Sequence, residues 1–164
     1  MLTVDDASRL VSAIRGHTLE ALWLCALTLG LHSGELLGLH WNDIDFGTGL
    51  LTVRRALQRV DGRLILVEPQ TALSRPTVPV PEPTLAALRA HRGRQNAHRL
   101  AAGTAWVDSG LVFSTRPGNP LEPCNVNRSW YTARTRAGLA RSAFTICATR
   151  PRHSCSRSGR RREP

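Results

Sequence analysis

The stretch Leu29–Asp45 reads LGLHSGELLGLHWNDID and decides how the rest of the chain is arranged. It ends one apolar helical segment, holds a second short one that Ser33 can cap, and closes with the polar run WNDID. Its glycines and leucines predict a tightly packed helical corner. Its histidines and carboxylates leave two other interpretations open, a site for chemistry and a metal site.

The residues before this corner predict two further helices. Leu10, Val11 and Ile14 fall on one face of a segment, as in an amphipathic helix. Residues 18–29 are apolar on nearly every face, which indicates a central buried helix, and Gly30 is placed to end it.

After the corner the hydrophobic period changes from helical to alternating. Residues 50–60 (LLTVRRALQRV) and 63–69 (RLILVEP) flank Asp61 and Gly62, a pair that supplies the positive φ angles of a tight hairpin turn. The segment TVPVP, residues 77–81, can add a third strand at an edge, because proline donates no hydrogen bond to a ladder. The predicted fold class is therefore mainly α with a small antiparallel three-stranded sheet (α+β).

Two more helices are predicted after the strands. Pro83 opens the first, with Leu85 and Leu88 turned inward. Its other face is basic and is expected to be solvated; that face comprises His91, Arg92, Arg94, His98 and Arg99. Pro123 opens the second, which Gly138 ends. Its predicted core positions are Val126, Trp130 and Ala133.

The composition points to an anionic partner. The chain has 164 residues and a formal net charge of +10, and arginine supplies all of the basic side chains because lysine is absent. Guanidinium groups contact phosphates while counterions are released, so nucleic acid is the commonest partner for such a protein. No apolar run is long enough to span a membrane and no signal peptide is visible, so we expect a cytoplasmic protein with no membrane partner. The four cysteines have no paired spacing and indicate neither a disulfide framework nor a zinc site.

Four segments occur in the order and spacing of one enzyme family. They are LTVDDASRLVSAIRG with LEALWLCALTLGLHSGELLGLHWNDIDF, then EPQTALSRPTVPVP, then GLVFSTRPGNPLEPCNVNRSWYTARTRAGL, and finally ATRPRHSC. Together they resemble the catalytic domain of the tyrosine recombinases, also called phage integrases. The resemblance treats residues 1–147 as a partial catalytic domain and implies the DNA breaking-rejoining fold of that family, in a bacterial, nucleoid-associated or mobile-element-derived protein.

The resemblance implies a chemistry that this sequence supports only in part. In the family a tyrosine attacks a DNA phosphate, two arginines with histidine or lysine donors stabilise the transition state, and no metal or nucleotide cofactor takes part. The position of the first arginine holds His32, which cannot offer a guanidinium fork. Glu35, the acid that orients this arginine in the family, is kept, and the position of the lysine holds Gln70.

The last segment, ATRPRHSC, resembles a damaged form of the family's box HxLRH. It keeps Arg152 as the second arginine and has Thr149 where the first histidine belongs. The only tyrosine, Tyr131, precedes this box and is expected to be a packing or surface aromatic rather than the nucleophile. The resemblance therefore predicts a catalytically inactive chain.

Residues 148–164 are rich in arginine and serine and lack apolar periodicity, which predicts a disordered tail. The abrupt change of composition suggests the hypothesis that a frameshift or recombination event near codons 144 to 156 truncated an integrase gene. Translation of the neighbouring DNA in the other two frames tests this hypothesis, because one of them should give a helical continuation with a tyrosine.

The predicted hairpin carries several arginines, and because alternate residues of a strand share a face, some of them can face a phosphate backbone. The residues predicted to contact DNA are Arg54, Arg55 and Arg75, with Arg59 and Arg63 as further candidates on the hairpin. The expected partner is double-stranded DNA, on which copies of the chain can self-associate. Two alternatives stay open: a small non-enzymatic interaction module, and an unstable gene fragment without function.

Other interpretations of the corner fit the sequence less well. His32 and His40, with Asp43 or Asp45, match no standard ligand spacing, so no metal site is predicted. The two aspartates are expected to cap the turn. Trp41 is expected to anchor the core rather than to stack on bases.

Overall fold

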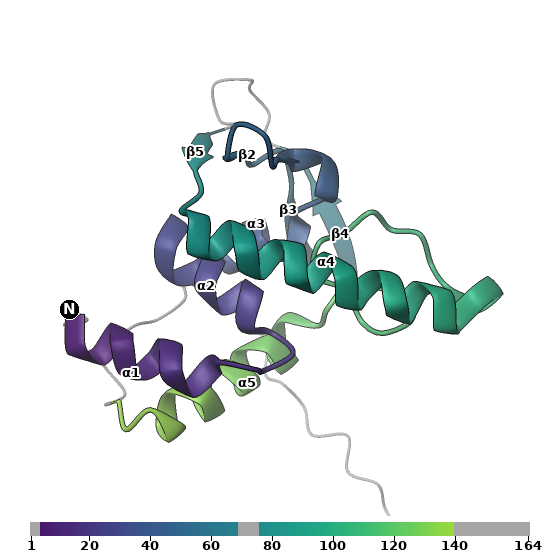
Figure 1. Ribbon diagram of the computed structural model, residues 1–164. Helices are drawn as coiled ribbons and strands as arrows, with labels where there is room; N and C mark the ends of the chain where they lie inside the picture. Colours follow the sequence, from purple (N-terminus) through teal and green to yellow (C-terminus); the bar gives the residue numbers. More distant parts are fainter. Residues whose placement is uncertain (1–3, 69–75, 140–164) are drawn as a thin grey trace, which may run out of the picture.

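A computed structural model describes residues 4–68 and 76–139 and is mainly helical (Figure 1). In this part of the chain the α-helices are α1 (Val4–Ile14), α2 (Glu20–Leu29), α3 (Ser33–Gly38), α4 (Glu82–Ala102) and α5 (Pro123–Arg136). The strands are β1 (Ile44–Asp45), β2 (Leu50–Thr52), β3 (Ala56–Val60), β4 (Arg63–Val67) and β5 (Thr77–Pro79). Single 3-10 turns lie at η1 (Trp41–Asp43) and η3 (Gly103–Ala105). The predicted class, mainly α with a small antiparallel sheet, is confirmed.

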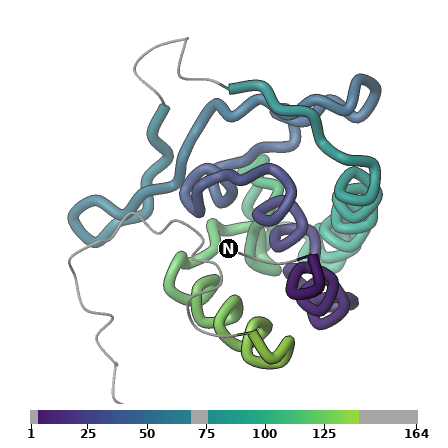
Figure 2. The backbone as a smooth tube through the Cα atoms, turned by 90° about the vertical axis from the view of Figure 1, so that its left-hand side faces the viewer, coloured from purple at the N-terminus to yellow at the C-terminus, as the bar shows by residue number. Residues whose placement is uncertain are grey.

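Helix α2 lies at the centre of the fold because nearly all of its side chains are apolar. Leu22, Trp23 and Cys25 are buried, and burial raises the pKa of the Cys25 thiol to about 12. The ring of Trp23 packs on Trp130 of α5 with centroids 5.0 Å apart, and α5 lies beside α1 (Figures 1 and 2). The helix ends at Gly30 in the left-handed conformation, with φ of 64°. The predicted central helix is therefore confirmed.

The strands form two small sheets. β2 pairs antiparallel with β1 on one side and with β5 on the other, so that Leu51 lies opposite both Ile44 and Val78. β3 and β4 form a separate antiparallel hairpin. Its turn has positive φ at Asp61 (48°) and at Gly62 (77°), as the sequence predicted.

The prediction that residues 50–60 form one strand is wrong, because β2 and β3 belong to different sheets. The N–H of Val53 still bonds to the carbonyl of Pro76 (2.9 Å), and beyond it the chain passes through Arg54 and Arg55 to β3. The backbone of β3 packs against α3, which draws this segment away from β2. β5 therefore joins β2 rather than the hairpin, and it lies at an edge of its sheet, as its prolines predicted.

Helix α4 packs on α2 and on the extended segment that follows η3. Leu85 and Leu88 are buried, as predicted. Gln95 is also buried; it accepts a hydrogen bond from Nε1 of Trp41 (2.7 Å) and donates to the carbonyl of Leu111 (3.1 Å). Trp41 thus anchors the corner to α4, which confirms its predicted role in the core.

Helix α5 closes the described part of the fold. Val126, Trp130 and Ala133 are buried, and Gly138 follows the helix with φ of 69°, as the sequence predicted. Among the helices of residues 4–68 and 76–139, none is long and apolar enough to cross a membrane.

Candidate nucleic-acid interface

The corner predicted from the sequence is built by close packing of α3 on β3. A Cβ added to Gly34 would lie 2.9 Å from the carbonyl oxygen of Leu57. A Cβ added to Gly38 would lie 2.9 Å from Cα of Ala56 and from the carbonyl oxygen of Arg55. No side chain fits at these distances, so the two glycines fix how closely the helix approaches the strand. The base of the hairpin is thereby held against α3.

His32 lies immediately before α3, in an extended conformation with φ of -67° and ψ of 152°. Its N–H donates to Oε2 of Glu35 (2.8 Å), and its Nδ1 lies 3.2 Å from the same oxygen. The predicted cap at Ser33 is wrong, because Ser33 already belongs to the helix and Glu35 supplies the acceptor at the helix start. The His32 side chain is 57% exposed, so the imidazole is open to solvent beside a carboxylate.

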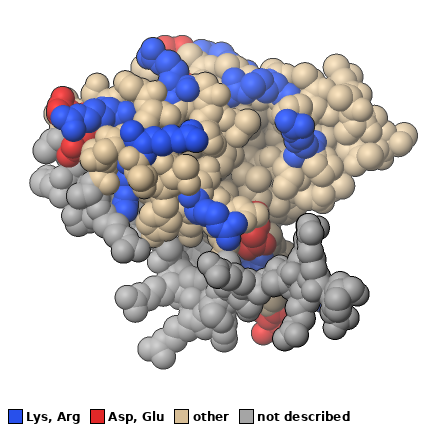
Figure 3. Space-filling model, turned by 90° about the horizontal axis from the view of Figure 1, so that it is seen from below, with Lys and Arg blue, Asp and Glu red and all other residues tan. Residues whose placement is uncertain are grey.

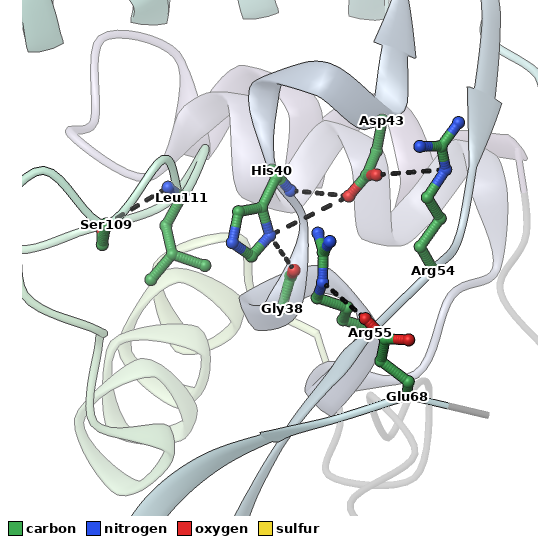
Figure 4. Close-up of polar contacts among 8 residues, drawn as sticks. All are labelled: Gly38, His40, Asp43, Arg54, Arg55, Glu68, Ser109 and Leu111. Carbon is green, nitrogen blue, oxygen red and sulfur yellow. Dashed lines mark hydrogen bonds and ion pairs between the residues drawn. The ribbon is translucent and has the colours of Figure 1, made fainter. Parts of the chain in front are cut away.

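Asp43 is a buried acid of the same corner. Its Oδ2 accepts the N–H of His40 (2.9 Å), while Nδ1 of His40 lies 2.9 Å from the carbonyl oxygen of Gly38. Its Oδ1 lies 3.6 Å from Nε of Arg54 (Figure 4). Asp45 caps the next turn by accepting two backbone N–H groups. Both aspartates cap turns, as predicted, and Asp43 also makes a charge contact with the hairpin base that the sequence did not indicate.

Arg54 and Arg55 lie between β2 and β3, at the base of the hairpin. Each is held through Nε, Arg54 by Asp43 (3.6 Å) and Arg55 by Glu68 (3.3 Å). The side chain of Arg54 is 49% exposed and that of Arg55 is 31% exposed. Figure 4 shows the terminal nitrogens of both guanidinium groups beyond these Nε contacts. These nitrogens are donors that a phosphate can engage.

The remaining candidate residues fall into three groups: one arginine is ion-paired within the chain, one is exposed, and the others lie outside the described residues. Arg59 forms an ion pair with Glu122 and donates to the carbonyl of Gly62 (2.7 Å), so its charge is engaged within the chain. Arg63, at the start of β4, is exposed. The candidates that lie outside the described residues are Gln70, Arg75, Thr149 and Arg152, and the predicted tail of residues 148–164 lies there too.

The basic face predicted for α4 is correct for its arginines, which are exposed, and wrong for His91. His91 lies between Trp41 and Phe113, with ring centroids 6.1 Å and 5.3 Å away, and its Nε2 is 2.7 Å from the carbonyl oxygen of Val112. Burial lowers the pKa of His91, although the hydrogen bond to Val112 opposes this shift. His91 is therefore part of the packing rather than of the basic surface.

Three further observations concern possible metal ligands, the tyrosine and the charged surface. Within the described ranges, no group of three or more His, Cys, Asp or Glu residues is arranged to hold a metal ion. Tyr131 is 52% exposed on α5, with the guanidinium of Arg134 5.2 Å from its ring centroid, so it is a surface aromatic as predicted. Figure 3 shows arginine side chains spread over the face seen from below, with acidic side chains beside some of them.

Comparison with known proteins shows which proteins this chain resembles. No protein-family model matches the sequence. A "tyrosine recombinase XerC-like" protein of Caldanaerobacter subterraneus subsp. tengcongensis is 35% identical over 152 aligned positions, and the match covers 85% of this chain and 39% of that protein. The chain is therefore similar to the tyrosine recombinases over most of its length. An integrase of Streptomyces ambofaciens is 31% identical to this chain over 142 aligned positions, and the match covers 80% of this chain and 35% of the integrase.

Solved structures show the same fold. The Tn1549 transposon integrase in complex with circular intermediate DNA superposes with a TM-score of 0.67 at 20% identity, over 88% of this chain and 48% of the integrase. The XerA recombinase superposes with a TM-score of 0.62 at 20% identity, over 84% of this chain and 42% of XerA. The chain thus has the fold of a tyrosine recombinase catalytic domain and spans less than half the length of each of these relatives.

Proposed function

We propose that this chain binds double-stranded DNA through the corner of His32 and the base of the hairpin, and does not itself cleave the DNA backbone. The observation that carries the proposal is the exposed imidazole of His32 beside Glu35, at a position where the resemblance implies an arginine. The fold is shared with the Tn1549 integrase, which was solved in complex with DNA. That relationship supports duplex DNA as the partner of this chain.

The absence of cleavage follows from the groups that the chain offers to a phosphate. Negative charge that develops on the transferred phosphate must be met by preorganised donors, and loss of one such donor typically costs about 10²- to 10³-fold in rate. Nδ1 of His32 is occupied by Glu35, which leaves one ring nitrogen where a guanidinium would offer a bidentate fork. The sequence contains no lysine, and the amide of Gln70 cannot protonate a leaving oxygen.

DNA binding requires fewer precisely placed groups than cleavage does. It depends on positive charge near the phosphates rather than on donors arranged for a transition state. Arg54 and Arg55 keep terminal nitrogens beyond their ion pairs and lie beside α3 (Figure 4). The chain also carries a formal net charge of +10. Binding of this kind releases counterions and weakens steeply as salt is added.

Fluorescence anisotropy with a labelled random-sequence duplex tests the binding, with salt raised from about 50 to about 200 mM. We expect binding that weakens with salt and is reduced in Arg54→Ala. Arg9→Ala is the matched control, because Arg9 lies on α1 and pairs only with the exposed Asp5 in the contacts seen here. Equal losses in both variants would contradict the assignment of the interface.

Circular dichroism and thermal melting of the same preparation distinguish the two alternatives to this proposal, an interaction module and an unstable fragment. A cooperatively folded chain without salt-dependent binding would support an interaction module of another kind. A chain without a folding transition would support an unstable fragment without function. The buried packing of Trp23 on Trp130 predicts a cooperative transition.

A further inference from the structure

We infer that Asp43 is a positioning residue that holds Arg54 in the orientation in which it contacts a DNA phosphate. The inference rests on the proposed DNA binding. It gives Asp43 a role in that binding although Asp43 itself does not touch the DNA. The side chain of Asp43 is only 1% exposed, and its Oδ1 accepts no hydrogen bond within the described ranges. A buried carboxylate oxygen requires a compensating charge or donor. Nε of Arg54, at 3.6 Å, provides that charge.

The carboxylate of Asp43 is itself held rigidly. Its Oδ2 accepts the N–H of His40 across the η1 turn. The ring of His40 is fixed on the carbonyl of Gly38, and its backbone forms a bridge with Leu111. The orientation of Oδ1 is therefore set by the packed corner rather than by solvent. A guanidinium that pairs with this oxygen is therefore held in a fixed orientation as well.

The geometry of Arg54 suits a phosphate contact. Asp43 meets the inner nitrogen, Nε, whereas the terminal nitrogens extend beyond the contact on a side chain that is 49% exposed. A guanidinium that is already oriented loses less conformational freedom when it binds a phosphate. The buried negative charge therefore favours DNA binding here, although a carboxylate near DNA would ordinarily oppose it.

The neighbouring pair of Arg55 and Glu68 provides a matched control. Its acid also meets the arginine at Nε, at 3.3 Å, but the side chain of Glu68 is 57% exposed. A solvated carboxylate holds its partner weakly, because both side chains exchange their contact for water. Removal of the negative charge of Glu68 should leave the orientation of Arg55 nearly unchanged.

The test compares duplex binding by Asp43→Asn and Glu68→Gln in the full chain, using the anisotropy assay with salt titration. Both variants remove one negative charge, which by charge alone strengthens binding to DNA. The amide oxygen in Asp43→Asn can still accept the His40 N–H, so the turn is retained. We expect Asp43→Asn to bind about tenfold more weakly, with a salt slope shallower by about 0.9. We expect Glu68→Gln to bind equally well or more tightly.

A double-mutant comparison shows whether Asp43 acts through the arginine. Asp43→Asn combined with Arg54→Ala should bind no more weakly than Arg54→Ala alone. Tighter binding by folded Asp43→Asn, or additive losses in the double variant, would overturn the inference. A wild-type chain that folds and does not bind the duplex would instead refute the proposed function on which the inference rests.

A second variant keeps the test decisive if Asp43→Asn does not fold. Arg54→Lys retains the positive charge, but a single ammonium group cannot pair with Asp43 and present a fork to a phosphate at once. Its duplex binding should fall to within about twofold of that of Arg54→Ala, whereas binding at the wild-type level would show that orientation by Asp43 is not needed.

Discussion

His32 lies at the start of helix α3 and is also a candidate for contact with a DNA phosphate. Its N–H and Nδ1 both meet Glu35, while its side chain stays 57% exposed. The resemblance to the recombinases picked out this position from the sequence alone, because the surrounding glycines and leucines are retained. The pairing of Asp43 with Arg54 could not be predicted from the sequence. The two residues lie in separate segments, and their contact depends on the packing of β3 against α3.

Substitution His32→Arg restores a guanidinium at this position. We expect tighter duplex binding and a salt slope steeper by about 0.9, because one more phosphate is neutralised. His98→Arg is the control, since His98 is exposed on α4 and the change adds the same charge away from the corner. Equal gains in the two variants, measured by anisotropy, would show that only net charge matters.

His91 predicts a dependence of stability on pH. Burial lowers its pKa in the folded chain below the ordinary value of 6.5, so the unfolded chain takes up a proton at a higher pH than the folded one. Stability is fully present above pH 6.5 and is lost as the pH falls through that value toward the lowered pKa. We expect melting temperatures to fall from about pH 8 to about pH 5, and the fall to be smaller in His91→Gln. An identical pH dependence in both proteins would refute this assignment.

Secondary-structure elements differ in how far local sequence determines them. The hairpin turn follows from Asp61 and Gly62, which adopt the positive φ angles that such a turn requires. Pairing of β5 with β2 does not follow from local sequence, because both strands are short and the alternation of residues 50–60 continues across the break between β2 and β3. The approach of α3 to β3 decides that break, and it depends on tertiary packing.

The contact of α3 with β3 is tested by adding one methyl group. Gly38→Ala would place a Cβ 2.9 Å from the backbone of β3 and should destabilise the chain by about 1–3 kcal/mol. Gly93→Ala is the matched control, because Gly93 lies within α4 with nothing within 4 Å of its added Cβ. That change should stabilise the chain by about 0.5–1 kcal/mol, because alanine favours helix. Denaturant unfolding measures both, and a neutral Gly38→Ala would contradict the close packing.

At the scale of the whole molecule, the helices form a core around α2, while α4 and the β3–β4 hairpin lie on different sides of it (Figure 2). Hydrophobic period predicted the helices and most of this core, because burial of apolar faces dominates the fold. The composition predicted an anionic partner but not where it binds, since arginines lie on several helices and strands and are spread over the face that Figure 3 shows. The proposed interface follows only when charge is combined with the geometry of the corner.

The central claim is that this chain binds duplex DNA without cutting it. The most direct measurement incubates the chain with a pooled library of nicked duplexes that trap a phosphotyrosyl intermediate, under conditions where anisotropy shows the DNA to be bound. The chain is then denatured and analysed for protein that stays attached to DNA. We predict complete release of the DNA, because His32 stands where the resemblance implies a guanidinium and no lysine is present. A covalent adduct that survives denaturation would contradict this account.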